Sequence, residues 1–295
     1  MMPRAGLSIL VVFCIATAGC AEASELIHVE HNIEYSNAGD QHLKLDLTRP
    51  LKIEGLAPAV VFIHGGAWTT GKRSHWQFAC DELARRGFVA VTVQYRLVPA
   101  FKFPAQLEDV QAAVRWLRAN AERFRIDPER VGAVGVSAGG HLAECLGVGA
   151  DVERLAPHPA NENAGPIDPS CRVQCVVSYY GPCDLTRQVS VGVSNVYLKF
   201  LGGTLEQARQ KYILASPLFW LTPDAAPTLL IHGTKDDVVA IEQSEIFRDR
   251  LKAVGVDAEL LPIAQAGHGF EGAGAERAAA AMYDWLERHL KAERK

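Results

Sequence analysis

Six short apolar runs recur along the chain, and stretches with the period of an amphipathic helix lie between most of them. The runs are rich in Val, Ile and Leu, and they continue without polar alternation, which is typical of strands covered on both faces of a parallel sheet. They occupy 59–66, 88–96, 130–137, 173–181, 227–234 and 258–263. The helical stretches occupy 74–87, 104–124, 242–255 and about 276–291. This order predicts an α/β fold, a doubly wound and mostly parallel sheet.

Two flanking features complete the predicted domain. The segments 26–35 and 42–50 surround the turn sequence SNAGD, and Leu43, Leu45 and Leu47 alternate with polar residues, so we expect an N-terminal antiparallel hairpin. The segment 186–216 breaks the strand–helix rhythm, and we expect it to be a small lid-like insertion that covers a pocket. A domain over 24–295 would hold all these elements.

The first residues are typical of a secretory signal peptide. Arg4 precedes an apolar run over 7–18, which is shorter than the roughly 20 residues of a spanning helix. Cleavage after AEA would remove residues 1–23, whereas TAGC at 17–20 resembles a lipobox in which Cys20 would be lipidated. We therefore expect an exported protein, periplasmic or secreted, which meets a membrane only if Cys20 carries a lipid.

The net charge and the cysteine spacing limit which partners and cofactors we expect this protein to bind. A net charge of −4 over 295 residues argues against a nucleic-acid partner. The five cysteines beyond the leader have no zinc-site spacing, so we expect neither a metal nor another cofactor. We interpret them as core residues, with a disulfide from Cys183 to Cys171 or Cys175 as the alternative; they are Cys80, Cys145, Cys171, Cys175 and Cys183.

A serine surrounded by very small residues follows one of the predicted strands. GVSAG at 135–139 has the pattern G-x-S-x-G, and a helical stretch follows it. A serine on so tight a strand-to-helix turn needs glycine two positions before and after it, because larger side chains would collide with neighbouring backbone. Gly135 and Gly139 fill these positions, and the turn predicts Ser137 as a nucleophile.

The partners that a nucleophilic serine needs follow in the order serine, acid, histidine. The loop after the run 227–233 carries Asp236 and Asp237, and the loop after 258–263 carries His268 between glycines. Donors for a tetrahedral oxyanion are expected from the N–H groups of Gly66, Ala67 and Ala138. The sequence thus predicts Ser137 as nucleophile and His268 as base, with one of the two aspartates as the orienting acid.

These motifs together resemble the α/β-hydrolase superfamily, and within it the small carboxylesterases. That branch includes hormone-sensitive-lipase-like esterases, acetyl-xylan and feruloyl-type esterases, and kynurenine formamidase. The resemblance implies Asp236 as the acid, from the pattern H-G-x-x-D, and structural roles for His64, Gly65 and Trp68. It is carried by HGGAW at 64–68, FPAQLEDV at 103–110, GVSAGGHLA at 135–143, YYGPCDL at 179–185, IHGTKDDVV at 231–239 and GHGF at 267–270.

The departures from the family pattern bear on the substrate. Ala67 and Trp68 replace the last glycine of H-G-G-G and its successor, and Val136 replaces an acidic residue. We also expect no large N-terminal cap before the hairpin. We therefore expect a serine carboxylesterase for short- to medium-chain or carbohydrate-linked acyl esters. H-G-G-x-W is shared with kynurenine formamidase, so an aryl-formamidase is the alternative. A non-catalytic binding protein on the same scaffold is disfavoured because Ser137, Asp236 and His268 are all present.

Overall fold

The computed structural model describes residues 26–149, 170–187 and 191–291. The predicted signal peptide, the lipidation site at Cys20 and most of the Pro/Asn-rich segment 151–170 lie outside the described residues. Within the described ranges, no helix combines the length and the apolar character that crossing a membrane requires.

An eight-stranded sheet forms the centre of the described chain, in the order β1-β2-β4-β3-β5-β6-β7-β8. β1 and β2 form the predicted antiparallel hairpin, β2 also pairs antiparallel with β4, and the remaining neighbours are parallel. The sheet class and the hairpin are therefore confirmed. The strands are β1 (Ile27–Asn37), β2 (His42–Pro50), β3 (Ala57–Ile63), β4 (Val89–Val93), β5 (Ile126–Val136), β6 (Cys175–Tyr179), β7 (Thr228–Gly233) and β8 (Ala258–Ile263).

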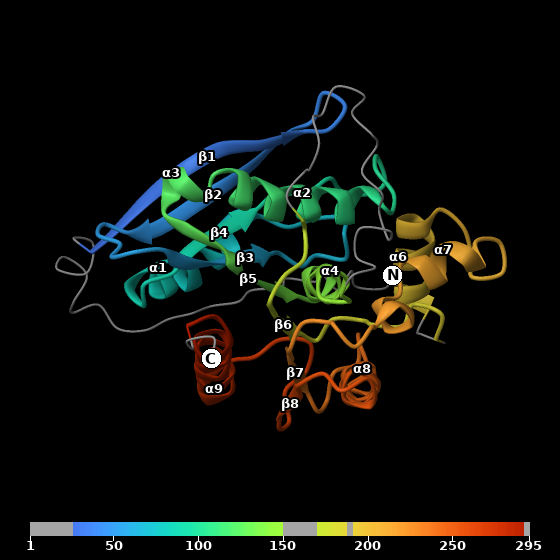
Figure 1. The fold of residues 1–295 in the computed structure, drawn as a ribbon. Coiled ribbons are helices and arrows are strands. Elements are labelled where there is room, and N and C mark those ends of the chain that lie inside the picture. Colours follow the sequence, from blue (N-terminus) through green and yellow to red (C-terminus); the bar gives the residue numbers. More distant parts are fainter. Residues whose placement is uncertain (1–25, 150–169, 188–190, 292–295) are drawn as a thin grey trace, which may run out of the picture.

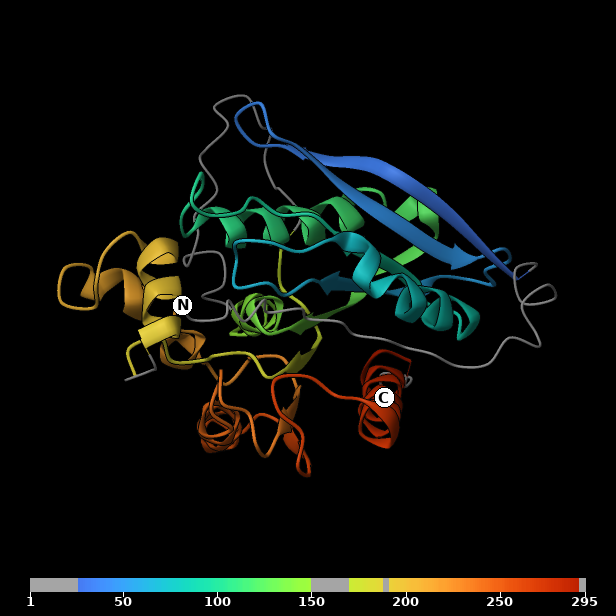
Figure 2. The same ribbon diagram turned by 180° about the vertical axis from the view of Figure 1, so that it is seen from behind.

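Helices cover both faces of this sheet, as Figures 1 and 2 show. One face packs against α2 (Ala105–Ala119), α4 (Ala138–Leu146) and α8 (Glu242–Ala253). The other packs against α1 (Gln77–Arg85), the preceding 3-10 turn η2 (Arg73–Trp76) and α9 (Gly272–Leu290). Successive residues of β3 contribute to opposite layers, because Val61 joins the first core and Phe62 the second. This two-sided burial explains the unbroken apolar runs.

The helix boundaries differ slightly from the prediction. The stretch 104–124 divides at Asn120 into α2 and α3 (Ala121–Phe124), because Asn120 leaves helical geometry with φ −106° and ψ 15°. α9 begins four residues before the predicted start near 276, after the extended residue Glu271. α9 packs into the core through Trp285 and Leu286, which are fully buried.

The insertion is helical where it is described. It contains α6 (Val191–Leu201) and α7 (Arg209–Leu214), and the turn η3 (Pro217–Trp220) follows it directly. In Figure 1 these helices gather at one end of the molecule, beyond α4. The five cysteines beyond the leader are buried and none of them forms a disulfide, so the interpretation as core residues is confirmed and the alternative disulfide is wrong.

Candidate active site

Ser137 lies between the end of β5 and the first residue of α4. Its backbone is in a left-handed region with φ 55° and ψ −119°, a conformation that costs a non-glycine residue about 1–3 kcal/mol. The Ser137 N–H donates to the Tyr179 carbonyl at 2.8 Å, which fastens the turn to β6. A single hydroxyl is thereby presented at the positive end of α4.

The glycines around Ser137 are required by close backbone contacts. A Cβ atom at Gly135 would lie 2.0 Å from the Gly139 carbonyl oxygen, and one at Gly139 would lie 2.2 Å from the Ile63 carbonyl oxygen. Neither contact can be relieved by moving a side chain. The reason given for the small residues of GVSAG is therefore confirmed.

Three residues predicted from separate loops meet in one hydrogen-bonded row. His268 Nε2 lies 2.9 Å from Ser137 Oγ, and His268 Nδ1 lies 2.7 Å from Asp236 Oδ2. The loops that carry Asp236 and His268 follow β7 and β8, whose carboxyl ends lie at the same edge of the sheet as that of β5. Asp237, the neighbouring candidate, is exposed and outside this row.

The Asp236 carboxylate is buried and fully committed to donors. Its Oδ1 atom accepts the N–H groups of Val238 and Val239, each at 2.9 Å. Its Oδ2 atom, besides facing His268, lies 3.3 Å from His232 Nε2. Burial alone would raise the pKa of Asp236, but hydrogen bonds from His232 and His268 outweigh burial and hold that pKa below its usual range. A carboxylate that is ionised near pH 7 can orient an imidazole and stabilise its protonated form.

His232, the histidine of the H-G-x-x-D pattern, is buried and contacts Asp236 directly. Its Nδ1 atom faces the Ser244 hydroxyl at 2.7 Å, and its Nε2–H donates to the Val239 carbonyl at 2.8 Å. These two bonds fix the tautomer that also directs N–H toward Asp236. The sequence indicates this contact through the pattern H-G-x-x-D, which places Asp236 four residues after His232.

The HGGAW loop brings backbone donors beside the serine. A Cβ atom at Gly65 would lie 3.3 Å from the Ser137 Cβ atom, so the two chains are in close contact. Gly66 and Ala67 have φ angles of 112° and 53°. Among the described residues, no backbone carbonyl accepts the N–H of Gly66, Ala67 or Ala138, which leaves all three donors available to a ligand.

His64 stabilises the HGGAW loop through contacts with Gly65 and Tyr95. Its ring stacks on Tyr95 at 4.2 Å, its Nδ1–H donates to the Gly65 carbonyl at 2.8 Å, and the Tyr95 hydroxyl donates to the His64 carbonyl at 3.0 Å. Burial lowers the pKa of His64 to about 4, so the ring is neutral near pH 7. This position agrees with a structural role.

A mostly apolar cavity of about 260 Å³ opens at Ser137 and His268. Its walls come from η2, α1, the end of β6 and α9, and none of the described residues of the insertion lines it. Sequence reasoning missed this wall, because the insertion was expected to cover the pocket. Wall residues outside the motifs quoted from the sequence include His75, Trp76, Ala79, Ala275, Ala278, Ala279, Met282 and Tyr283, whereas Tyr179, Tyr180 and Phe270 lie within YYGPCDL and GHGF but were not predicted as site residues.

Tyr180, which the sequence placed in the motif YYGPCDL without a role at the site, packs directly against His268. Its ring centroid is 4.5 Å from that of His268, and its backbone has φ 42°, which is rare for an aromatic residue. No group of His, Cys, Asp and Glu residues within the described ranges is arranged to hold a metal ion.

The sheet order and the serine at the turn between β5 and α4 define the α/β-hydrolase fold. Structures with this fold include a carbohydrate esterase from gut microbiota, with TM-score 0.77 and 25% identity over 91% of this chain and 98% of that one. An esterase of Thermogutta terrifontis with butyrate bound matches with TM-score 0.74 and 25% identity over 90% of this chain and 95% of that one. Within this superfamily, residues 45–251 match the BD-FAE family, and the chain belongs to it.

Curated relatives agree with this assignment. Mycobacterium tuberculosis provides a probable carboxylic ester hydrolase, LipM, with 34% identity over 83% of this chain and 56% of the relative. Esterase LipC of the same organism has 33% identity over 73% of this chain and 53% of the relative. The chain thus spans about half the length of the curated relatives it matches.

Proposed function

We propose that this protein is a serine carboxylesterase in which Ser137, His268 and Asp236 form a catalytic triad. The observation that carries the proposal is the row of hydrogen bonds, 2.9 Å from Ser137 Oγ to His268 and 2.7 Å from His268 to Asp236. Esterase relatives along most of the chain support the reaction class.

The geometry supports a two-step reaction through an acyl-enzyme. Ser137 Oγ attacks the ester carbonyl carbon while its proton passes to His268 Nε2, and the carbonyl oxygen becomes an oxyanion. The N–H groups of Gly66, Ala67 and Ala138 stabilise this charge. The alcohol then leaves with the proton from His268. A water molecule, deprotonated by the same imidazole, attacks the acyl-enzyme and releases the acid.

The cavity supports short- to medium-chain acyl groups. A volume of about 260 Å³ with aromatic and alanine walls excludes water from a small acyl group and leaves little room for a long one. The relative with butyrate bound and the relative described as a carbohydrate esterase support short acyl esters, including carbohydrate-linked ones, as substrates. The leader sequence supports export, so that such esters would be met outside the cytoplasm.

Two experiments test the proposal. A fluorophosphonate should label the wild type and not Ser137→Ala, and absence of labelling in the wild type would refute the serine mechanism. Nitrophenyl esters of increasing chain length and acetylated xylo-oligosaccharides define the substrate. Preference for long chains would contradict the small-pocket interpretation, and faster cleavage of N-formylkynurenine than of any ester would favour the aryl-formamidase.

A further inference from the structure

The HGGAW loop at 64–68, called the oxyanion loop from here on, packs against the insertion through one aromatic stack. Trp68, the last residue of HGGAW, is 2% exposed, and its ring lies flat on Phe200 of α6 with centroids 4.2 Å apart and an interplanar angle of 8°. His141 of α4 meets the same indole edge-on at 5.1 Å. A side chain of the insertion is therefore packed against the residue that follows the Ala67 donor.

Backbone hydrogen bonds join the same two elements through a third segment. The Val98 N–H donates to the Trp68 carbonyl at 3.0 Å, and the Phe103 N–H donates to the Phe200 carbonyl at 2.9 Å. The segment 96–103 thus bridges the oxyanion loop and α6. His141 adds a link from α4, since its Nε2–H donates to the Ala215 carbonyl at 2.6 Å.

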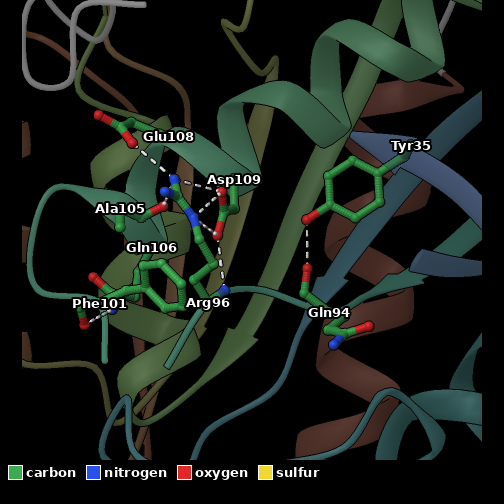
Figure 3. Close-up of polar contacts among 8 residues, drawn as sticks. All are labelled: Tyr35, Gln94, Arg96, Phe101, Ala105, Gln106, Glu108 and Asp109. Atoms are coloured by element: carbon green, nitrogen blue, oxygen red, sulfur yellow. Dashed lines mark hydrogen bonds and ion pairs between the residues drawn. The ribbon is translucent and has the colours of Figure 1, made fainter. Parts of the chain in front are cut away.

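The bridging segment is itself fastened to α2 by Arg96, as Figure 3 shows. Arg96 Nε lies 2.9 Å and 3.0 Å from the two carboxylate oxygens of Asp109, whose side chain is 2% exposed, and the Arg96 backbone N–H donates to Asp109 at 2.7 Å. Arg96 Nη2 donates to Glu108 at 2.8 Å and to the Ala105 carbonyl at 3.1 Å. Charge-assisted bonds to a buried carboxylate are among the stronger polar contacts in proteins.

The loop that these contacts hold is conformationally unfavourable. Ala67 and Trp68 both have left-handed backbones, with φ 53° and 55°. Each such residue costs about 1–3 kcal/mol and persists only when its surroundings enforce it. The described part of the insertion packs against this loop through Phe200, whereas it contributes no wall to the cavity at Ser137.

We propose that the insertion acts as a buttress rather than a lid: Phe200 of the insertion, together with the Asp109–Arg96 pair outside it, positions the oxyanion loop in its donor-presenting conformation. The proposal rests on the proposed esterase function. A buttress and a lid make opposite kinetic predictions. Loss of a buttress misaligns donors that act on the transition state and lowers kcat, whereas loss of a lid alters substrate binding and acyl preference.

The test compares Phe200→Leu with Leu198→Ala, a control on the same helix whose side chain is 41% exposed. For Phe200→Leu we expect kcat on nitrophenyl acetate to fall about 10- to 100-fold, because small misplacements of catalytic groups have effects of this size. KM and the order of acyl preference should stay unchanged, and Leu198→Ala should match the wild type. Phe200→Met, which fills the space without a ring, provides the same comparison if Phe200→Leu does not fold.

Asp109→Asn weakens the contact of Asp109 with Arg96 and leaves the stack of Trp68 on Phe200 in place. The kcat of this variant should also fall. Hydrogen exchange of residues 64–72 should be faster in the Phe200 and Asp109 variants than in Leu198→Ala, and this readout needs no enzymatic activity. Wild-type kcat and exchange in folded variants, or a change confined to KM and acyl preference, would overturn the buttress. A wild type without ester turnover would refute the proposed function, and the exchange comparison would still test the buttress.

Discussion

Replacing Asp236 with Asn is expected to remove nearly all activity while leaving the fold intact. The two backbone N–H groups of Val238 and Val239 both point at Oδ1, so the amide oxygen of an asparagine must take that place. The amide NH2 then lies where Oδ2 faces His268. Because NH2 can only donate, it forces the proton of His268 onto Nε2, the atom that must accept the proton of Ser137. The opposite amide orientation would set NH2 against two backbone donors.

The loss in kcat should be about 10⁴-fold, the size seen when a triad imidazole is held in the wrong tautomer, which equals about 5.5 kcal/mol of transition-state stabilisation. The assay is nitrophenyl acetate hydrolysis, with thermal melting to verify folding. Asp237→Asn makes the same chemical change at the exposed neighbour and should retain wild-type kcat. If Asp236→Asn keeps kcat within tenfold of the wild type, or Asp237→Asn shows the larger loss, the assignment of the acid is wrong.

Three further outcomes follow from buried groups. Burial raises the pKa of Glu144 to about 8, so the contribution of this group to stability should decline as pH rises from about 4.3, the pKa in the unfolded chain, through about 8. The melting temperature of Glu144→Gln minus that of the wild type should therefore grow over this range. A difference that stays constant with pH would contradict this expectation. Gly139→Ala places a Cβ atom 2.2 Å from a backbone oxygen and should cost about 3 kcal/mol or more in chemical denaturation, so wild-type stability would show that the turn can relax. The five cysteines beyond the leader should react with a thiol reagent only after unfolding, whereas fewer than five reactive thiols in denatured, unreduced protein would reveal a disulfide.

Local pattern was sufficient to predict the sheet and the row at its edge. Parallel strands end at one edge, so residues that follow strands, such as Ser137, Asp236 and His268, must lie near one another, and chain order assigns their roles. The pocket wall could not be predicted this way. Ala275 and Ala278 lie on a helix that follows every catalytic motif, and only the tertiary packing of α9 across the sheet brings them to the serine.

The role of the insertion was hidden for a similar reason. Trp68 and Phe200 are 132 residues apart, and neither residue's neighbours indicate that their rings stack. Likewise the left-handed backbone of Tyr180 has no signal in its own side chain, since glycine would be the expected residue at such a position.

The face of α9 that lines the cavity is where substitutions would change acyl selectivity. Ala275, Ala278 and Ala279 line the cavity, whereas Trp285, Leu286 and Leu290 anchor the helix in the core. Under the proposed function, substitutions at these three alanines would reshape the cavity that receives the acyl group, while Trp285, Leu286 and Leu290 would keep the helix anchored. Because Ser137, Asp236 and His268 all lie outside α9, we expect single substitutions at these three alanines to change acyl selectivity without displacing the proposed triad, and directed evolution for new acyl groups would begin there.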